Sequence, residues 1–425
     1  MESFVAIASG NHLCSNPRVV KEACALSAAG FKVCVLGGAY TAGLKQRDLR
    51  LAKGRNWEFR HVYDLTESAT ARIWLKAQRK FGLFLWAKAR LANPWQIFYG
   101  TGKVARAVAR LDADLTIVHW EAALPAGIRL LKRGKAVGID MEDWFSEDLL
   151  ASARSSRPIA MLAAMEKKLL SEGVHSTCTS EAMADALVGR YQCPRPLPIR
   201  NVFPSAERDK MDGVWKDRTE LTGRNDPSFP RSATTPVSIF WYSQTTGPGR
   251  GLEELFAAAS LLRGNFQIHL RGDIRGYEAW FDGLVAPHVR AKTRIHAVVD
   301  NEELLSRIAE HDVGFAGERP EPPSRDLTIT NKLFQYLQGG LAVMASKTSG
   351  QKEAANAADG AVILHEPGDV AALSANLQRL IDDRSALNAM RAAAWKAGGR
   401  LSWENEAPKL VDAVKQVVAK SRATD

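Results

Sequence analysis

The sequence has few cysteines and no long apolar run, and each absence excludes a class of protein. Five cysteines occur in 425 residues, an odd number, and none stands in a Cys-x-x-Cys pair. A disulfide framework or a cysteine-based zinc site is therefore not expected, and a reducing, cytoplasmic location fits best. No tract of about 18 uninterrupted apolar residues is present, so the sequence predicts no membrane-spanning helix.

Two nucleotide-binding patterns and a signal peptide are also missing. The strict Gly-x-Gly-x-x-Gly pattern and the P-loop pattern do not occur, so hydride transfer and ATP hydrolysis lose support. The first ten residues lack the basic and then apolar layout of a signal peptide, and Phe4–Ala8 instead predicts a buried first strand.

Basic residues are in excess, which favours an anionic partner. The net charge is +10 and the isoelectric point is near 9.4. Such a balance attracts nucleic acid, anionic lipid or phosphorylated small molecules. No nucleic-acid-binding motif is found, so we expect no nucleic-acid partner.

Residues 72–95 concentrate cations and aromatic side chains. Helical spacing places Trp74, Gln78, Phe81 and Leu85 near one side. The segment is either an interfacial helix on an anionic membrane, which makes the protein peripheral at the inner membrane face, or a surface helix whose aromatic side chains pack inward.

Strands alternate with helices in both halves of the chain. In residues 1–204, Phe4–Ala8 and Leu115–Val118 are apolar runs suited to a buried parallel sheet, and Asn16 before Pro17 predicts a helix N-terminus. The alternation predicts a doubly wound α/β domain.

Residues 205–236 break this pattern and are rich in polar residues, glycine and proline, which predicts a linker or surface loop. The alternation resumes over 237–400, a second doubly wound domain, in which Asp300 and Glu303 predict a capping box. Residues 401–425 are expected to form a C-terminal helix. Open α/β sheets bind ligands in the loops beyond the carboxyl ends of their strands.

The loop after the strand Val237–Tyr242 predicts a phosphate site. It contains Gly247, Gly249 and Gly251 and opens directly into a helix. Glycines allow backbone N–H groups to approach a ligand, and the helix start adds a partial positive charge. Arg250 could hold a diphosphate by bidentate hydrogen bonds. The alternative is a tight turn that needs glycine for its geometry alone.

A second loop, residues 317–332, follows a buried strand and precedes a helix. Thr330 or Asn331 is predicted to cap that helix, and Lys332 is placed to meet an anion. Glu318 could accept hydrogen bonds from sugar hydroxyls, or could simply be solvated.

In the first half, His119 and Asp140 each follow a predicted strand. His119 could orient or deprotonate an acceptor hydroxyl, or could be a packed histidine at a strand end. Asp140, Glu142 and Asp143 do not form a convincing metal cluster, because no further ligand follows at suitable spacing, so no metal is predicted.

These landmarks together resemble glycosyltransferase family 4 and its relatives, the glycosyl transferases of group 1, which have the GT-B fold. The most specific similarities are Gly249-Arg250-Gly251-Leu252 and the run from Asn331 through Lys332 and Gln335 to Leu337, followed by Gly340. Weaker ones are the Ser15–Val19 helix start, the pair His119 and Asp140, Thr177–Ser180, and Asn201–Pro204 at the hinge.

The resemblance implies two Rossmann-like domains facing each other across a cleft, and a retaining sugar transfer from a nucleoside diphosphate sugar without a required metal or other cofactor. The acceptor would be a glycan or lipid-linked molecule, with surface polysaccharide synthesis as a role. The catalytic residues it implies, with Glu318 added from its position, are Arg250, Lys332, His119 and Glu318. The expected donor-binding residues are Ser243, Gln244, Gly247, Gly249, Gly251, Val298, Val299, Thr330, Asn331 and Gln335, and the expected acceptor-binding residues are Asn16, Arg18, His119, Asp140 and Glu142.

The sequence departs from the family at two positions. Many members have glutamates where this chain has Leu327 and Gln335. Gln335 can still bind a ribose hydroxyl, and Glu318 is a candidate replacement for the other acid. The alternatives to a transferase are a nucleotide-sugar epimerase and a non-catalytic homologue that binds nucleotide or a partner enzyme.

Overall fold

The computed structural model describes residues 2–424 and divides them into two compact units. The first runs to Arg200 and also contains Pro322–Ser324 and the residues from Ala407 onward. The second contains Asn201–Glu321 and Arg325–Glu406. The division thus lies close to the predicted boundary at 204. The end of the chain, however, groups with the first unit rather than forming a separate part.

The first unit is built on a parallel sheet whose strand order is β3-β2-β1-β4-β5-β6-β7. Its strands are β1 (Phe4–Ala8), β2 (Lys32–Ala39), β3 (Glu58–Asp64), β4 (Leu115–His119), β5 (Val137–Met141), β6 (His175–Cys178) and β7 (Leu197–Pro198). Every residue of β4 and β5 is buried, as expected for parallel strands covered on both faces. The chain order reverses between β1 and β4, which pair directly, for example Val5 with Leu115.

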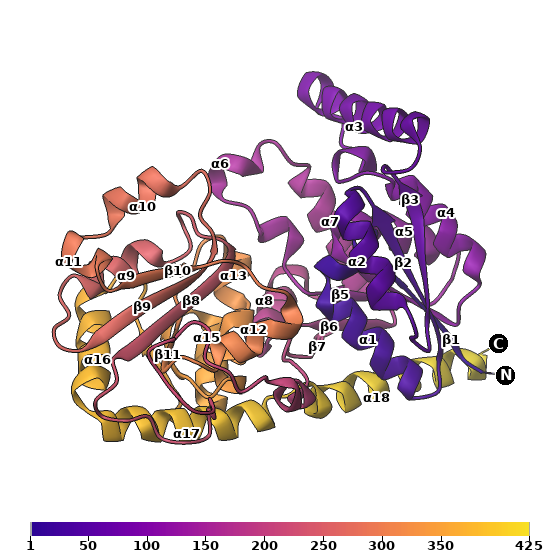
Figure 1. The fold of residues 1–425 in the computed structure, drawn as a ribbon. Helices are drawn as coiled ribbons and strands as arrows, with labels where there is room; N and C mark the ends of the chain where they lie inside the picture. The colour runs from indigo at the N-terminus through magenta and orange to yellow at the C-terminus, as the bar shows by residue number, and fades with distance from the viewer. Residues whose placement is uncertain (1, 425) are drawn as a thin grey trace. The chain divides into compact units, whose positions relative to one another are not determined.

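Helices connect these strands (Figure 1). They are α1 (Pro17–Ala28), α2 (Ala42–Ala52), α3 (Ala69–Ala89), α4 (Thr101–Leu111), α5 (Trp120–Leu131), α6 (Ala151–Arg154), α7 (Ile159–Glu172) and α8 (Glu181–Tyr191), with short 3-10 helices η1 (Leu13–Ser15), η2 (Pro94–Gln96) and η3 (Phe145–Glu147). The predicted cap of α1 is confirmed, because the Asn16 side chain accepts a hydrogen bond from the Val19 N–H.

The second unit has a six-stranded parallel sheet with the order β10-β9-β8-β11-β12-β13. Its strands are β8 (Val237–Thr245), β9 (Phe266–Asp273), β10 (Thr293–His296), β11 (Val313–Ala316), β12 (Ala342–Ser346) and β13 (Val362–His365). Its helices are η4 (Ser205–Lys210), α9 (Leu252–Ala259), α10 (Glu278–Leu284), α11 (Pro287–Arg290), α12 (Asn301–Ile308), α14 (Asn331–Gln338), α15 (Ser349–Ala357), α16 (Val370–Asp382) and α17 (Arg384–Arg400). Helices α13 (Pro323–Leu327) and α18 (Trp403–Thr424) each contain residues of both units. Two doubly wound α/β units confirm the predicted fold class.

Residues 205–236 are largely irregular, as predicted, but part of this segment is firmly packed. Arg218 is fully buried, and its guanidinium lies 3.0 Å from the carboxylate of Asp312, which is also buried. The Glu310 carboxylate accepts hydrogen bonds from the backbone N–H groups of Lys216, Asp217 and Arg218. The segment is therefore part of the second unit rather than a free linker, because its charged residues find buried partners.

Two predicted caps were wrong in detail. Asp300 precedes α12 and Thr330 precedes α14, but neither side chain makes a capping hydrogen bond. In the second case the Thr330 carbonyl oxygen still accepts the Leu333 N–H, so the helix begins where predicted without side-chain help.

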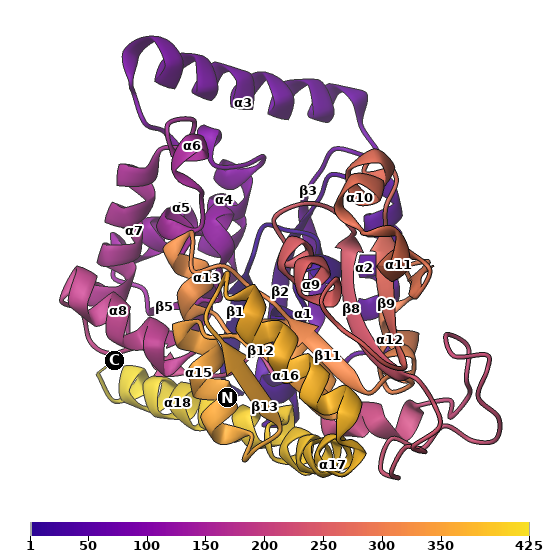
Figure 2. The same cartoon turned by 90° about the vertical axis from the view of Figure 1, so that its left-hand side faces the viewer.

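Helix α3 covers the segment that the sequence marked as cationic and aromatic. The interpretation in which its aromatic side chains pack inward is wrong, because Trp74 is 63% exposed, Phe81 52% and Phe84 55%. Both views show α3 standing apart from the sheet of the first unit (Figure 2). No helix within residues 2–424 combines the length and apolarity needed to cross a bilayer.

Candidate functional site

The carboxyl end of the second sheet brings the two predicted ligand loops together. Strands β8 and β11 are neighbours, whereas β9 lies on the other side of β8, so the strand order reverses between β8 and β11. The loops that follow these two strands contain Arg250 and Glu318. Ligands bind open α/β sheets at such a reversal point.

Glycine is required where the two loops meet. Gly251 has a φ of +81°, and a Cβ atom there would lie 2.9 Å from the Gly317 carbonyl oxygen. Gly249 has a φ of +75°. A side chain at Gly251 would be strained and would also push the loops apart, so these glycines fix the loop that leads into α9. Arg250 lies between them, is exposed, and makes no ion pair with any residue in the described part of the chain.

Glu318 and Lys332 form an ion pair in this site. The Lys332 Nζ lies 3.1 Å from the Glu318 Oε1, and the two side chains are 12% and 22% exposed. The Glu318 backbone N–H donates to the Ser346 hydroxyl at the end of β12, at 2.9 Å. The structure thus brings together two residues that are 14 positions apart, and keeps both accessible to a ligand.

The other predicted donor-binding residues surround the same sheet edge or follow neighbouring strands. The amide oxygen of Gln335, on α14, accepts a short hydrogen bond from the Tyr242 hydroxyl of β8. Ser243 and Gln244 continue β8, and Gly247 packs near the ring of Tyr277. Thr330 and Asn331 precede and begin α14, where the Asn331 Oδ1 accepts from Asn201 at 3.1 Å.

Val298 and Val299 follow β10, which is separated from β11 by the two strands β9 and β8. Val298 is 55% exposed. The carbonyl oxygen of the preceding residue, Ala297, accepts a short hydrogen bond from Arg271, whose other amino group is paired with Asp217. Arg271 therefore fixes the loop that contains the two valines.

The first unit contains a buried charge network at the corresponding edge of its sheet. Arg18, on α1, donates to both carboxylate oxygens of Asp140 at 2.9 and 3.0 Å, and to the Ile199 carbonyl oxygen at 2.7 Å. The Thr177 hydroxyl donates to the same carboxylate at 2.8 Å. Burial would raise the pKa of Asp140, but Arg18 and His119 outweigh burial and lower it. Arg18 and Asp140 thus form a charge-paired unit in the core.

His119 contacts Glu22 rather than an open surface. Its Nε2 lies 2.5 Å from the Glu22 Oε2, and both side chains are buried. Burial would lower the pKa of His119, but Glu22, Asp140 and Glu142 outweigh burial and raise it to about 9. The imidazole is therefore protonated at neutral pH. A protonated imidazole can donate a hydrogen bond but cannot take a proton from an acceptor hydroxyl, so only the orienting role is compatible with this environment.

Asn16 and Glu142 complete the predicted acceptor set. The Asn16 side-chain amide donates to both oxygens of Glu142, at 3.0 and 2.7 Å, while its carbonyl caps α1. Burial raises the pKa of Glu142. Burial and the nearby carboxylates of Asp148, Glu142 and Asp140 raise the pKa of Asp143 to about 7.

Four residues near these sites were not among the expected site residues: Glu22, Trp120, Tyr242 and Asp143, the last of which was considered only as a metal ligand. Trp120 follows His119 with a φ of +60°, unusual for a bulky side chain and the kind of strain found near binding sites. The positions of Asp143 and Tyr242 directly after β5 and within β8 were a usable signal. Nothing in the sequence connects Glu22 to His119.

Two side-chain clusters have the spacing of metal ligands, namely His12, Asp48 and His61, and Glu22, His119 and Asp140. In the first, the His12 Nδ1 donates to Asp48 at 2.6 Å and its Nε2 accepts the N–H groups of Tyr40 and Thr41 at 3.1 Å. In the second, the oxygens of Asp140 are taken by Arg18 and Thr177. Hydrogen bonds thus occupy the atoms of the first cluster and the oxygens of Asp140, while Glu22 and His119 are paired with each other, and we assign no metal to either cluster.

Solved structures share the architecture of this chain. Sucrose-phosphate synthase from Thermosynechococcus elongatus superposes with a TM-score of 0.70 at 16% identity, covering 99% of this chain and 100% of that chain. HepE from Anabaena, in complex with UDP, gives a TM-score of 0.66 at 12% identity, with 98% and 100% coverage. A Listeria monocytogenes protein assigned as a UDP-N-acetylglucosamine 2-epimerase gives 0.60 at 12% identity, with 99% and 98% coverage.

The chain has the GT-B fold, which is what similarity at such low identity shows. No protein-family profile matches the sequence. No curated protein matches it either.

Proposed function

We propose that this protein is a glycosyltransferase that moves a sugar from a nucleoside diphosphate sugar to an acceptor with retention of the anomeric configuration. The observation that carries the proposal is the meeting of two loops at the reversal point of the second sheet. These loops supply an unpaired Arg250 and the accessible pair of Lys332 and Glu318.

The charges of this site suit the departure of a diphosphate. Arg250 would bind the diphosphate oxygens, and Lys332 would stabilise the negative charge that develops as the glycosidic bond breaks. Glu318, freed from Lys332 when the diphosphate takes its place, would accept hydrogen bonds from sugar hydroxyls. Two cations neutralise the leaving group, so the proposal requires no metal ion.

The rest of the donor would extend along the same sheet edge. Gln335, oriented by Tyr242, would bind a ribose hydroxyl. The loop with Val298 and Val299, held by Arg271, would contact the base. HepE is described in complex with UDP and with UDP-glucose, which supports a uridine nucleotide as the first donor to test.

The acceptor is proposed to bind the first unit near His119 and Asp140. There the buried His119, paired with Glu22, would hold the start of α5 in place for the acceptor, and the ion pair of Arg18 and Asp140 would keep the local structure rigid. Asn16 and Glu142 would complete this site.

The acceptor is further proposed to be lipid-linked and to serve surface polysaccharide synthesis. The support is α3, whose exposed Trp74, Phe81 and Phe84 accompany lysines and arginines without an acidic residue in the helix. Aromatic side chains flanked by cations bind the interface of an anionic membrane. The protein would then be peripheral at that surface, near acceptors embedded in it.

Two other functions fit the same fold. A nucleotide-sugar epimerase would change the sugar without transferring it, and the similarity to the Listeria protein favours testing this. A non-catalytic homologue would bind nucleotide or a partner enzyme without turnover. Leu327 and Gln335, in place of acids found in many relatives of the resembled family, are the reason to consider it.

The test is a product analysis with UDP-, GDP- and ADP-glucose, followed by their N-acetylated analogues. A transferase releases the nucleoside diphosphate, slowly by hydrolysis and faster when a membrane extract supplies acceptor. Arg250→Ala should lower the rate of release by about 100-fold or more. A changed sugar still attached to nucleotide would establish the epimerase instead. Nucleotide binding without any release or epimerised product would establish the non-catalytic homologue.

A further inference from the structure

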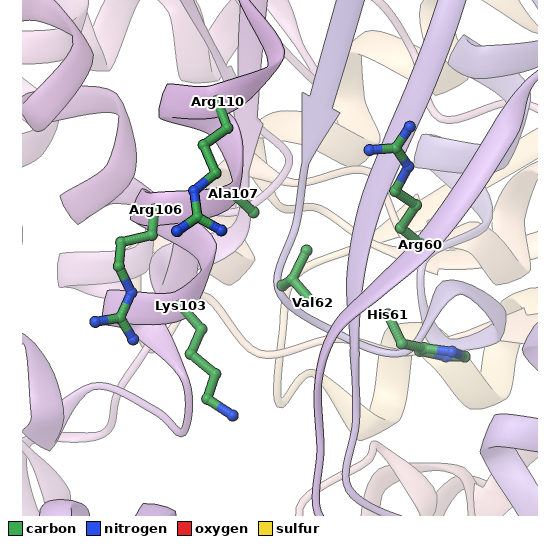
Figure 3. Close-up of a pocket in the computed structure, with 7 residues that line it drawn as sticks. All are labelled: Arg60, His61, Val62, Lys103, Arg106, Ala107 and Arg110. Carbon is green, nitrogen blue, oxygen red and sulfur yellow. The ribbon is translucent and has the colours of Figure 1, made fainter.

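The first unit has a basic pocket that lies outside both sites described above. It has a volume of about 380 Å³ and lies between α4 and the edge strand β3. Figure 3 shows one wall formed by Lys103, Arg106 and Arg110 of α4 and the other by Arg60 and Val62 of β3. The other two lining residues are Ala107 of α4 and His61 of β3, and the His61 imidazole lies 3.0 Å from the Asp48 carboxylate. No acidic residue lines the pocket.

The geometry of α4 explains why three cations share one wall. Lys103, Arg106 and Arg110 are three and four residues apart, which places them on one side of the helix. Val104 and Val108 face the sheet and are buried. The hydrophobic packing of α4 therefore forces its cations to project into the same space.

These three cations are not neutralised by the protein. Residues 68–111 contain nine lysines and arginines and no aspartate or glutamate. Lys103, Arg106 and Arg110 make no ion pair within residues 2–424, whereas Arg60 across the pocket is paired with Glu58. Like charges on one helix face destabilise it, and an anion in the pocket would remove that cost.

We infer that this pocket binds a phosphate group, as a phosphomonoester or diphosphate, independently of the nucleotide-sugar site. Two guanidinium groups on one face match the oxygens of a phosphate and can bind it through paired hydrogen bonds. The volume is that of a small-ligand site. Only Val62 and Ala107 supply apolar lining, so the ligand is recognised by charge rather than by a hydrophobic body.

The phosphate can come from a soluble phosphorylated metabolite or from a lipid headgroup, and the test separates these sources. The soluble probe is inorganic pyrophosphate, titrated calorimetrically at low ionic strength. The full chain carries Arg250→Ala and Lys332→Ala, so that binding at the proposed donor site does not contribute. The lipid probe is vesicles of phosphatidylcholine with and without phosphatidic acid, and for this probe the chain also carries Trp74→Ser, Phe81→Ser and Phe84→Ser, so that α3 does not contribute.

The pocket variant is Arg106→Gln with Arg110→Gln. Its control is Lys132→Gln with Arg133→Gln, which removes the same charge from two exposed cations that follow α5 and do not line the pocket. The inference predicts binding of at least one probe, weakened about tenfold or more in the pocket variant and nearly unchanged in the control. Binding of pyrophosphate identifies a soluble ligand, and binding of phosphatidic acid vesicles alone identifies a headgroup.

Failure of both probes to bind, or equal weakening by the control, would overturn the inference. A second measurement addresses the variant itself. Because it removes like-charge repulsion, the pocket variant should unfold at a higher temperature than the control in low salt without ligand, and the difference should shrink in 0.5 M salt. An equal or lower unfolding temperature would contradict the charge argument. Neither result depends on sugar transfer.

Discussion

At the residue scale, the proposed chemistry depends on two cations, Arg250 and Lys332, which have different environments. Arg250 is exposed without an ion-pair partner among the described residues, whereas Lys332 is paired with Glu318 at 3.1 Å. Arg250→Ala and Lys332→Ala should each lower kcat by about 100-fold or more, as expected when one group that stabilises transition-state charge is removed. Steady-state rates of nucleoside diphosphate release measure this.

The matched control for those variants is Lys352→Ala. Lys352 is an exposed lysine on α15, outside both loops of the donor site. Its kcat should equal that of the wild type. Unchanged rates in Arg250→Ala and Lys332→Ala alike would remove the basis for the donor-site assignment.

The raised pKa of His119 predicts how the stability of the protein depends on pH. Its pKa is about 9 in the folded protein against an ordinary value of 6.5. The protonated form is therefore stabilised by folding: this contribution is fully present below pH 6.5 and is lost as the pH rises through 9. The difference in unfolding free energy between wild type and His119→Gln should shrink by on the order of 3 kcal/mol from pH 6 to pH 10.

Urea unfolding at a series of pH values measures that difference, and comparison of the two proteins removes the effect of other titrating groups. A difference that stays constant with pH would show that folding does not raise the pKa of His119, so that the imidazole would be largely neutral above pH 7. In that case His119 could again be considered as the base that takes a proton from an acceptor hydroxyl.

The candidate residues of the second unit could be listed from the sequence because short motifs contain them. The glycine loop and the Asn331–Leu337 segment are each continuous in the sequence, so local pattern was enough to name their residues. The environment of His119 could not be predicted. Glu22 is on α1 and His119 at the end of β4, and they meet only because β4 pairs with β1. No sequence spacing encodes that pairing.

At the scale of elements, α3 shows what helical periodicity can and cannot establish. Its existence was predicted, but a cationic helix with one aromatic side has the same pattern whether that side faces the protein or the solvent. Burial of Leu75 and Gly82 and exposure of Trp74 settle which side packs. Likewise, the charged segment around Arg218 looked like a loop, since its partners, Asp312 and Glu310, lie about 90 residues away.

Exposure of α3 predicts membrane binding. Wild-type protein should sediment with vesicles rich in anionic phospholipid at low salt, and less at high salt. The reason is that attraction between the cations of α3 and the lipid headgroups assists insertion of the aromatic side chains, and salt screens this attraction. The triple variant Trp74→Ser, Phe81→Ser, Phe84→Ser should stay in the supernatant. The control, Phe229→Ser with Leu261→Ser, removes residues that are 66% and 59% exposed in the second unit and should sediment normally.

Equal sedimentation of the triple variant and the wild type would exclude α3 as the contact. Absence of sedimentation in the wild type would remove the support for a membrane-bound acceptor. It would leave the proposed sugar transfer untouched, since the proposed donor site lies in the second unit.

At the scale of the whole molecule, the sequence predicted two parallel α/β sheets and the approximate boundary between the units, because alternating strands and helices restrict the topology. It did not predict the strand order in either sheet. That order determines the proposed site, since it makes β8 adjacent to β11 and so brings the loop with Arg250 against the loop with Glu318, where Gly251 meets Gly317. The fold class of each unit follows from the local sequence pattern. Which loops lie side by side follows from the way the strands pair.

The most direct test of the proposed donor site is the thermal stability of wild type and Arg250→Ala with UDP, GDP, ADP, dTDP and CMP. A nucleotide at about 100 times its dissociation constant adds about 2.7 kcal/mol of stability to a protein that binds it only when folded. We predict that one nucleoside diphosphate raises the unfolding temperature of the wild type and not that of Arg250→Ala. If no nucleotide stabilises the wild type, the donor site and the proposed transfer are both contradicted.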